Sequence, residues 1–204
     1  MKRALRKFES VNLIMILFIL CFQNTSAQIY KDSLLSYQQN YINNHEVVGK
    51  DDKKYIHFYP VDESYRVTAT FKKKDDAKGF DMITASGKKQ LYFRYGLLTF
   101  KLHNSLVHLY IYQSASLMKQ EKYKDYLFVP FGDATSGFDS YGGGRYLDFT
   151  ISDIKNNRLV IDFNKAYNPY CAYTAGYNCP IPPKENLLTI PIRGGEENYG
   201  KPVH

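Results

Sequence analysis

The sequence has little that could hold it in a membrane. Its longest apolar run, Leu13–Phe22, has ten residues, whereas a helix that spans a bilayer needs roughly 20. Basic residues precede this run, and the small residues Thr25 and Ala27 follow it. Basic, then apolar, then small residues is the order found in a secretory signal peptide. We therefore predict a signal peptide over 1–27, a mature chain that begins near Gln28, and export to the periplasm or the exterior. The membrane is then a partner only through the signal peptide during export.

A strong excess of one charge is also missing. The whole chain has 27 basic and 20 acidic residues, a formal charge of +7. Residues 1–27 hold four basic residues and one acid, so 28–204 keeps 23 − 19 = +4. The basic runs GKDDKK and FKKKDDAKG both contain aspartates and are typical of solvated turns. This balance argues against nucleic acid as a partner, and the remaining length is typical of one domain, 28–204.

The sequence lacks the short motifs of common metal and catalytic sites. It has no H-E-x-x-H or H-x-H spacing, no G-x-S-x-G elbow and no G-K-[ST] after a glycine-rich turn. We therefore predict no metal and no cofactor, and no reaction follows from these patterns. The histidines are expected at the surface or in cross-strand packing: His45, His57, His103, His108 and His204.

Cysteine is scarce. Cys21 belongs to the predicted signal peptide, which leaves Cys171 and Cys179. An even number of cysteines in an exported chain suggests a disulfide, and so short a loop would gain roughly 2–3 kcal/mol from it. Buried reduced thiols and metal or redox chemistry are the alternatives. A zinc site would need two further ligands, and no histidine lies in the 166–186 stretch; the spacing also excludes a C-x-x-C pair.

A helix is expected only at the start of the predicted domain. Tyr30, Leu34, Tyr37 and Tyr41 recur at helical spacing and form one stripe. This pattern predicts a short amphipathic N-terminal helix that lies on something larger.

The rest of the chain has the pattern of β-structure. Ten short runs are rich in β-branched and aromatic residues: YIHFYPV, YRVTATF, FDMITA, KQLYFRYG, LLTFKLH, LVHLYIYQ, YLFVPF, RYLDFT, RLVIDF and LLTIPIR. Turn residues at 86–88, 103–105 and 155–157 suggest hairpins. Leu98, Phe100 and Leu102 alternate with polar residues, which indicates an antiparallel sheet. We predict a mainly β fold, an antiparallel β-barrel or β-sandwich of about ten strands.

Two features in the second half of the chain could bind a ligand. Three glycines, 142–144, precede Arg145, and such a turn can gather backbone N–H groups around an anion. The alternative is a plain turn whose arginine pairs with a nearby acid. Four aspartates lie on or beside predicted strand ends and could act in acid–base chemistry or hold calcium, although aspartates there more often hold turns: Asp133, Asp139, Asp148 and Asp162.

The second feature is a long irregular segment, 164–186, between two predicted strands. Its prolines force an extended path, and loops of this length in a compact domain are usually functional or specially braced. Tyrosines give it an aromatic surface that could stack on a flat ligand: Tyr167, Tyr170, Tyr173 and Tyr177. The alternative is that these rings close the open end of the β-structure.

The runs PFGDATSG, YGGGRYLDF, DFNKAYNPYCAY and CPIPPKENLL together resemble the bacterial and archaeal family of unknown function DUF1684. The upstream HFYPVDESYRVTATF and ITASGKKQLYFRYGLLTF fit the same family, so the resemblance covers nearly all of the predicted domain. It implies no established activity, cofactor or substrate. It places the family's signature on Asp133, Thr135, Tyr141, Gly143, Arg145, Asp148, Asn164, Tyr167, Asn168, Cys171, Cys179 and Glu185.

Our leading hypothesis is an exported module that binds a small anionic or sugar-like ligand, or serves structurally. Its face would join the 142–145 turn to the tyrosine-rich loop closed by Cys171 and Cys179. The candidate ligand-binding residues are Asp133, Tyr141, Gly143, Arg145, Asp148, Asn164, Tyr167, Asn168, Tyr170, Tyr173 and Glu185.

An enzyme is the rival hypothesis. It would be a hydrolase of cell-envelope or nutrient material, with Asp133 or Asp148 as acid or base and Arg145 stabilising negative charge. In the third reading both signatures are structural. Convergence of Arg145, Asp133, Tyr167 and Glu185 on an open pocket would favour binding or catalysis, whereas mutual burial would favour structure.

Overall fold

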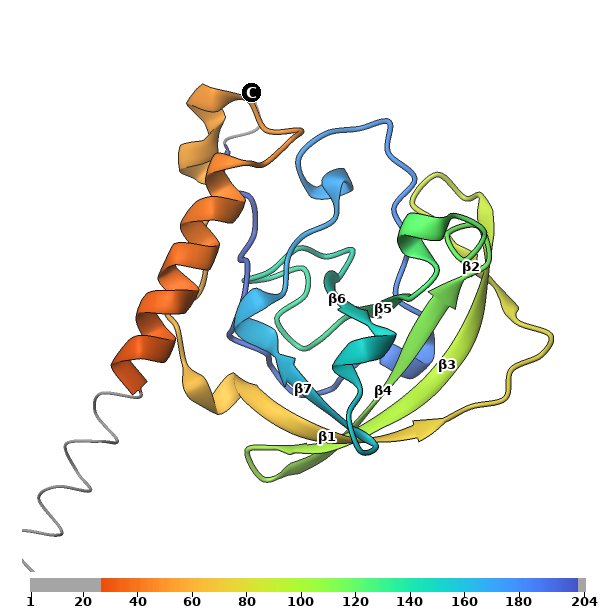
Figure 1. The fold of residues 1–204 in the computed structure, drawn as a ribbon. Coiled ribbons are helices and arrows are strands. Elements are labelled where there is room, and N and C mark those ends of the chain that lie inside the picture. The colour runs from red at the N-terminus through yellow and green to blue at the C-terminus, as the bar shows by residue number, and fades with distance from the viewer. Residues whose placement is uncertain (1–26, 202–204) are drawn as a thin grey trace, which may run out of the picture.

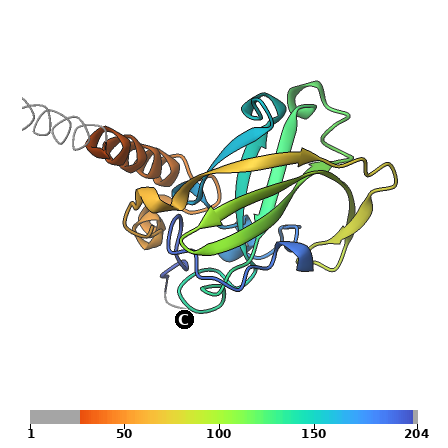
Figure 2. The same ribbon diagram turned by 90° about the horizontal axis from the view of Figure 1, so that it is seen from below.

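The computed structural model describes residues 27–201 (Figure 1). It begins within a helix, described over 27–43, that stands beside a strongly curled sheet (Figure 2). The predicted signal peptide lies outside the described residues apart from Ala27, and Gln28, the predicted start of the domain, is already helical. Among the described residues, no helix is both long and apolar enough to cross a membrane.

The sheet has seven antiparallel strands. They are β1 (Arg66–Lys73), β2 (Phe80–Ile83), β3 (Lys89–Leu102), β4 (Ser105–Ser114), β5 (Tyr126–Phe131), β6 (Arg145–Thr150) and β7 (Arg158–Asp162). Their order is β6-β5-β4-β3-β1-β7, and β2 pairs with β3. The two end strands, β6 and β7, are not paired with each other, so the sheet is a curled half-barrel. The mainly β prediction is confirmed, whereas the closed ten-strand barrel and the sandwich were wrong.

Four of the ten predicted runs account for the difference, because two are not strands and two merge into one. The runs at 55–61 and 187–193 form only isolated bridges, at Phe58 and Leu187. Each contains a proline, Pro60 or Pro191, whose missing N–H cannot join a strand ladder. Two other runs are continuous in β3, which bends at a β-bulge near Gly96 instead of turning back.

Short 3-10 helices connect the strands and cover their ends. They are η1 (Lys50–Tyr55), η2 (Glu63–Tyr65), η3 (Glu121–Tyr123), η4 (Ile151–Asp153), η5 (Phe163–Lys165), η6 (Tyr170–Ala172) and η7 (Lys184–Asn186). The last three divide the long segment after β7, which is irregular as predicted.

Side chains are buried on both faces of β5 and β6, since residues on a strand alternate between faces. Leu127, Val129 and Leu147 belong to the main hydrophobic core, which also contains Leu98, Phe100 and Leu102 of β3. The predicted alternation of β3 is thus confirmed. Phe128 and Tyr146, on the opposite face, join a second cluster with Met82, Tyr92 and Tyr112. A second layer must therefore cover this opposite face.

The N-terminal helix supplies part of that layer. Leu34, from the predicted stripe, is 2% exposed. Tyr30 donates a hydrogen bond to Asp162 at the end of β7, 3.0 Å from Oδ2. Tyr41, one turn beyond Tyr37, shares a hydrogen bond of 3.1 Å with Tyr173 of the long segment. The predicted stripe therefore faces both the sheet edge and the 164–186 segment.

Candidate functional site

Arg145 lies inside the protein, with 0% of its surface exposed. Its guanidinium donates to the carbonyls of Ile192 (2.7 Å), Gly194 (2.7 Å) and Glu196 (3.0 Å), and to Asp133 Oδ2 (2.9 Å). These bonds fasten the C-terminal segment to the start of β6. The side chains of both Arg145 and Asp133 are inaccessible in this buried pair, so neither enters the site proposed below.

Close packing explains why glycines occupy the turn before Arg145. A Cβ on Gly143 would lie 2.4 Å from the ring of Tyr141. Gly144 has φ +82°, and a Cβ there would lie 2.6 Å from the carbonyl oxygen of Phe131. Tyr141 in turn donates to the carbonyl of Cys171, at 3.3 Å. The turn is thus held by its neighbours, and the adjacent arginine points into the protein.

Two predicted asparagines act as buried clamps, both with 0% exposure. Asn164 Oδ1 accepts from the backbone N–H of Asp62 (3.0 Å), and its Nδ2 donates to the Asp62 carbonyl (2.8 Å). Asn168 donates from Nδ2 to the Glu197 carbonyl (2.7 Å). Both residues tie distant loops together and leave no free surface for a ligand.

Glu185 lies in a separate cluster on η7. Its Oε1 accepts from Arg94 Nε (2.8 Å) and from the Tyr112 hydroxyl (2.8 Å), and its Oε2 accepts from Arg94 Nη2 (3.2 Å). It therefore joins η7 to β3 and β4. The four residues whose convergence we considered are thus distributed over three places. Tyr167 lines the two cavities described below. Asp133 borders a separate, smaller cavity of about 370 Å³ beside the glycine turn, but its side chain is inaccessible.

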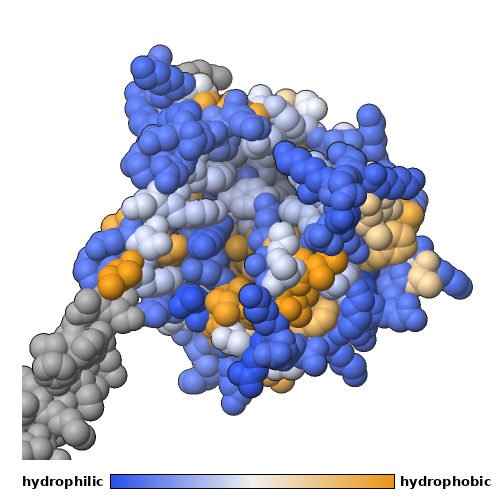
Figure 3. Space-filling model, viewed as in Figure 1, coloured by the Kyte–Doolittle hydropathy of each residue, from blue (hydrophilic) through white to orange (hydrophobic). Residues whose placement is uncertain are grey.

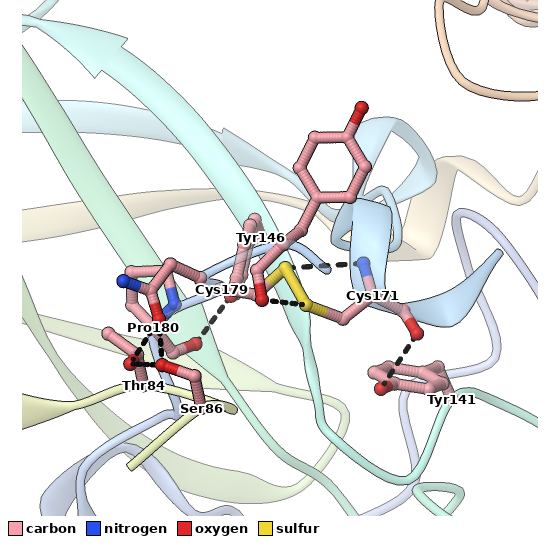
Figure 4. The surroundings of a disulfide bond; sticks show 9 residues. Thr84, Ser86, Tyr141, Tyr146, Cys171, Cys179 and Pro180 are labelled. Carbon is pink, nitrogen blue, oxygen red and sulfur yellow. Dashed lines mark hydrogen bonds between the residues drawn. A yellow bond between two sulfur atoms is a disulfide. The ribbon is translucent and has the colours of Figure 1, made fainter. Parts of the chain in front are cut away.

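The tyrosine-rich loop is closed by a disulfide, as predicted. The sulfur atoms of Cys171 and Cys179 are at bonding distance, and their Cα atoms lie 6.2 Å apart (Figure 4). Tyr141 bonds to the carbonyl of Cys171 on one side, and Tyr146 of β6 donates to the carbonyl of Pro180 on the other. The loop is thus anchored at both ends over the second hydrophobic cluster.

An open cleft runs between this loop, the N-terminal helix and the end strands β6 and β7, which do not pair with each other, and Figure 3 shows the hollowed face. It consists of two adjoining cavities of about 560 and 540 Å³ that share Tyr37, Asp148 and Tyr167. We call it the tyrosine cleft. Its aromatic half is lined by Tyr37, Tyr41, Tyr146, Asp148, Tyr167, Pro169, Tyr170, Tyr177, Asn178, Cys179 and Pro180. Its charged half follows the seam between β6 and β7 and contains Arg66, Asp148, Asp153, Lys155, Asp162 and Lys165.

Asp148 lies where the two halves meet. Its Oδ1 accepts from the Tyr126 hydroxyl (2.6 Å) and its Oδ2 from the Tyr167 hydroxyl (2.8 Å). The residue is exposed to solvent through the cleft, although protein packed around its carboxyl partly desolvates it. This desolvation raises the pKa of the Asp148 carboxyl, and the two phenol hydrogen bonds offset part of the shift.

A second acid, Glu196, is fully buried behind the aromatic wall. Its Oε2 accepts from the backbone N–H of Asn168 (2.9 Å) and from the Tyr41 hydroxyl (3.1 Å), and its Oε1 accepts from the Tyr173 hydroxyl. Burial raises the pKa of Glu196 to about 7. Tyr173, a predicted ligand-binding residue, therefore supports the wall of the cleft from behind.

Of the predicted ligand-binding residues, Asp148, Tyr167 and Tyr170 line the tyrosine cleft. Sequence reasoning missed Tyr37, Tyr41 and Tyr146 as lining residues. The tyrosines of the N-terminal helix could have pointed to the first two, since a helix face that only packs in a core rarely carries so many hydroxyl groups. Nothing in the run GGEENYG distinguishes Glu196, which is buried, from its neighbour. Within residues 27–201, no three His, Cys, Asp or Glu side chains gather in a group that could hold a metal ion.

Comparisons with known proteins agree with the fold and add no activity. The solution NMR structure of an uncharacterized protein from Haloarcula marismortui is similar, with a TM-score of 0.62 and 25% sequence identity. The match covers 85% of this chain and 96% of that one. No curated protein matches the chain. The family model described as a protein of unknown function, DUF1684, matches residues 53–197. This span includes β1–β7, the disulfide loop and Glu196, and the chain belongs to the DUF1684 family.

Proposed function

We propose that the protein is a small-ligand-binding module and that its ligand enters the tyrosine cleft. The observation that carries the proposal is the position of Asp148, a carboxylate that solvent reaches at the meeting point of two cavities. Asp148 is held there between the hydroxyls of Tyr126 and Tyr167. A well-held polar group that faces an open, mostly aromatic cavity is the usual arrangement of a binding pocket.

The size and rigidity of the cleft support this role. Each half, at about 540 or 560 Å³, falls in the range of pockets that hold small molecules. Tyrosine offers a large contact area with few rotatable bonds. The disulfide and the bond from Tyr146 to Pro180 hold the aromatic wall in place before a ligand arrives. Little conformational entropy is therefore lost on binding.

The structure redistributes the roles that we assigned to ligand-contacting residues. Arg145 is enclosed and cannot meet an anionic group, so such a group would have to lie in the charged half, beside Arg66, Lys155 or Lys165. Tyr167 and Tyr170 keep their proposed role as ring contacts. A sugar-like ligand stays a prediction, since its hydroxyls could donate to Asp148.

Export also stays a prediction. The Cys171–Cys179 disulfide is consistent with it, because disulfides persist mainly in oxidising compartments.

A hydrolase is the second candidate, and the raised pKa of Asp148 favours it, since it is a shift in the direction that a general acid needs. Only this part of the earlier enzyme hypothesis keeps access to a ligand, because Asp133 and Arg145 are buried in their ion pair. Chromogenic glycosides and esters test the idea. Turnover that disappears in Asp148→Asn would support it, and turnover that persists in that variant would exclude Asp148 as the acid.

Thermal shift with a panel of sugars, organic acids and amines tests the binding proposal. A ligand at 100 times its dissociation constant stabilises a protein by about 2.7 kcal/mol. We expect a hit that is lost in Tyr177→Ala, because Tyr177 lines the aromatic half and is 41% exposed. Tyr123→Ala is the control, since Tyr123 is partly exposed outside the cleft. A hit that both variants retain would place the ligand elsewhere and contradict the proposal.

A further inference from the structure

We infer that the aromatic half of the tyrosine cleft binds an organic cation, a quaternary or alkylated ammonium group, with Asp148 as its counter-ion. The inference rests on the proposed binding function and names the chemical class of the ligand.

The first argument is charge. Six tyrosines and Asp148 line the aromatic half. Among the described residues, no lysine, arginine or histidine belongs to this lining. Burial raises the pKa of Tyr37 and of Tyr170 to about 12, so their phenols stay neutral at neutral pH. Once ionised, Asp148 therefore gives the aromatic half a negative charge that no cation of its lining offsets.

The cations of the cleft lie on its other side. Arg66, Lys155 and Lys165 line the charged half, together with Asp153 and Asp162. A bound ammonium group would meet Asp148 from the aromatic half, opposite these side chains. It would also favour the ionised form of Asp148, whose pKa burial raises.

The second argument is the orientation of the rings. Tyr146 and Tyr167 stand at 89° to each other, and Tyr41 and Tyr167 at 47°, with centroids 5.8 and 6.2 Å apart. Tyr170 and Tyr177 are inclined at 69°. Mutually inclined rings form a cage rather than a slot with parallel walls. A compact, rounded group with a positive charge suits such a cage, since cations are attracted to aromatic faces.

The third argument is that the cleft already uses this chemistry. Lys165 Nζ, in the charged half, lies 5.3 Å from the centroid of Tyr37. Tyr37 lines both halves. Asp148 also keeps acceptor capacity, because each of its oxygens accepts one phenol hydrogen bond and a carboxylate oxygen has two lone pairs.

Calorimetric titration of the full chain with choline, tetramethylammonium and 3,3-dimethylbutan-1-ol tests the inference. The alcohol has the shape of choline without its charge. We expect both cations to bind and the alcohol to bind at least tenfold more weakly. Asp148→Asn should weaken choline at least tenfold. Asp81→Asn, which removes the same charge from an exposed ion pair with Lys89, should leave choline affinity unchanged.

A second pair of variants covers the case in which Asp148→Asn does not fold. Tyr177→Leu removes one exposed ring of the cage and should weaken choline severalfold, whereas Tyr123→Leu, outside the cleft, should not. Equal binding of choline and its uncharged isostere would overturn the inference. So would failure of both cations to bind at millimolar concentration. If a sugar or an acid still binds and Tyr177→Ala abolishes that binding, the proposed function stands without the cation; if nothing binds, both fall.

Discussion

Arg145 and Asp148 leave the same strand three residues apart and have different surroundings. Arg145 shares a face of β6 with Leu147 and enters the main core, whereas Asp148 shares the other face with Tyr146 and meets the cleft. The run RYLDF contained this information, since its odd positions pair the arginine with apolar residues. The alternation of side chains between the two faces of a strand could therefore have predicted that Arg145 is buried. It could not have predicted the partners, which are Asp133 and three carbonyls of the 192–196 segment.

Replacement of Arg145 by methionine tests its structural role. Arg145→Met leaves Asp133 as a buried charge without its partner, so we expect a loss of about 3–5 kcal/mol in the free energy of unfolding. Urea denaturation measures it. The double variant with Asp133→Asn should recover part of the loss, because the buried charge is then gone. Arg193→Met, which breaks an exposed pair with Asp139, should cost at most about 1 kcal/mol; an equal cost for both arginines would contradict this account.

Glu196 predicts a pH dependence of stability. The pKa of Glu196 is about 7 in the folded protein, above its ordinary value of 4.5. The folded state therefore holds this proton more tightly than the unfolded state does. Its contribution to stability is therefore complete below pH 4.5 and is lost as the pH rises through 7. At about 1.4 kcal/mol for each pKa unit, the loss is about 3 kcal/mol.

Glu196→Gln should remove this slope. An amide keeps an oxygen that can accept from Tyr41 or Tyr173, and it does not ionise. Urea denaturation of both proteins from pH 5 to 8 gives the difference in free energy. His45, whose pKa burial lowers, contributes the opposite slope below its ordinary pKa, but equally in both proteins. Parallel curves would show that Glu196 does not titrate in this range.

Among the elements, β3 shows how two predicted strands become one. The bulge near Gly96 lets the strand bend while the ring of Phe71 from β1 packs against it. A Cβ on Gly96 would lie 2.1 Å from that ring. We expect Gly96→Ala to cost about 1–3 kcal/mol in urea denaturation, as overpacking does. Gly49→Ala is the control, because nothing lies within 4 Å of its added Cβ. In the Gly96→Ala background, Phe71→Leu should relieve the clash and recover part of the lost stability. No recovery would contradict the explanation by overpacking.

Local turn chemistry was the most predictable part of the fold. Gly87 and His103 have positive φ at the predicted β2–β3 and β3–β4 hairpins. Asn156 and Asn157 also form a tight turn, closed by paired bonds of 2.9 Å between Lys155 and Arg158. However, β7 then pairs with β1 rather than with β6. The local sequence determines the conformation of a turn. It determines less well which distant strand pairs with the strand after the turn, since that pairing depends on long-range packing.

The disulfide loop gives a test at the same scale. Replacement of both Cys171 and Cys179 by serine should lower the free energy of unfolding by about 2–3 kcal/mol, the entropy expected for a loop of this length. Urea denaturation with and without dithiothreitol measures it. Reductant should shift the wild-type midpoint and leave the double variant unchanged. A wild type that is insensitive to reductant would indicate that the bond does not form in solution.

For the molecule as a whole, the sequence indicated the tyrosine-rich loop but not the cleft. Tyr167 and Tyr170 could be named because they lie in one conspicuous segment. Tyr37 comes from the helix and Asp148 from β6, and only tertiary packing places them at one cavity. The cleft exists because the sheet does not close into a barrel. Neither the composition nor the number of predicted strands tells whether a sheet closes.

The seam between β6 and β7 also has a mechanical consequence. No ladder joins β6 to β7, whereas ladder hydrogen bonds join β7 to β1 and β6 to β5. A single backbone bridge, between Tyr146 and Tyr167, links β6 to the segment that follows β7. The two edges can separate slightly without breaking a ladder, so the seam is a compliant joint in an otherwise continuous sheet. A molecule seated across Asp148 would brace that joint. Amides of β7 should then exchange with deuterium more slowly when the cleft is filled, while those of the β3–β4 hairpin keep their rates.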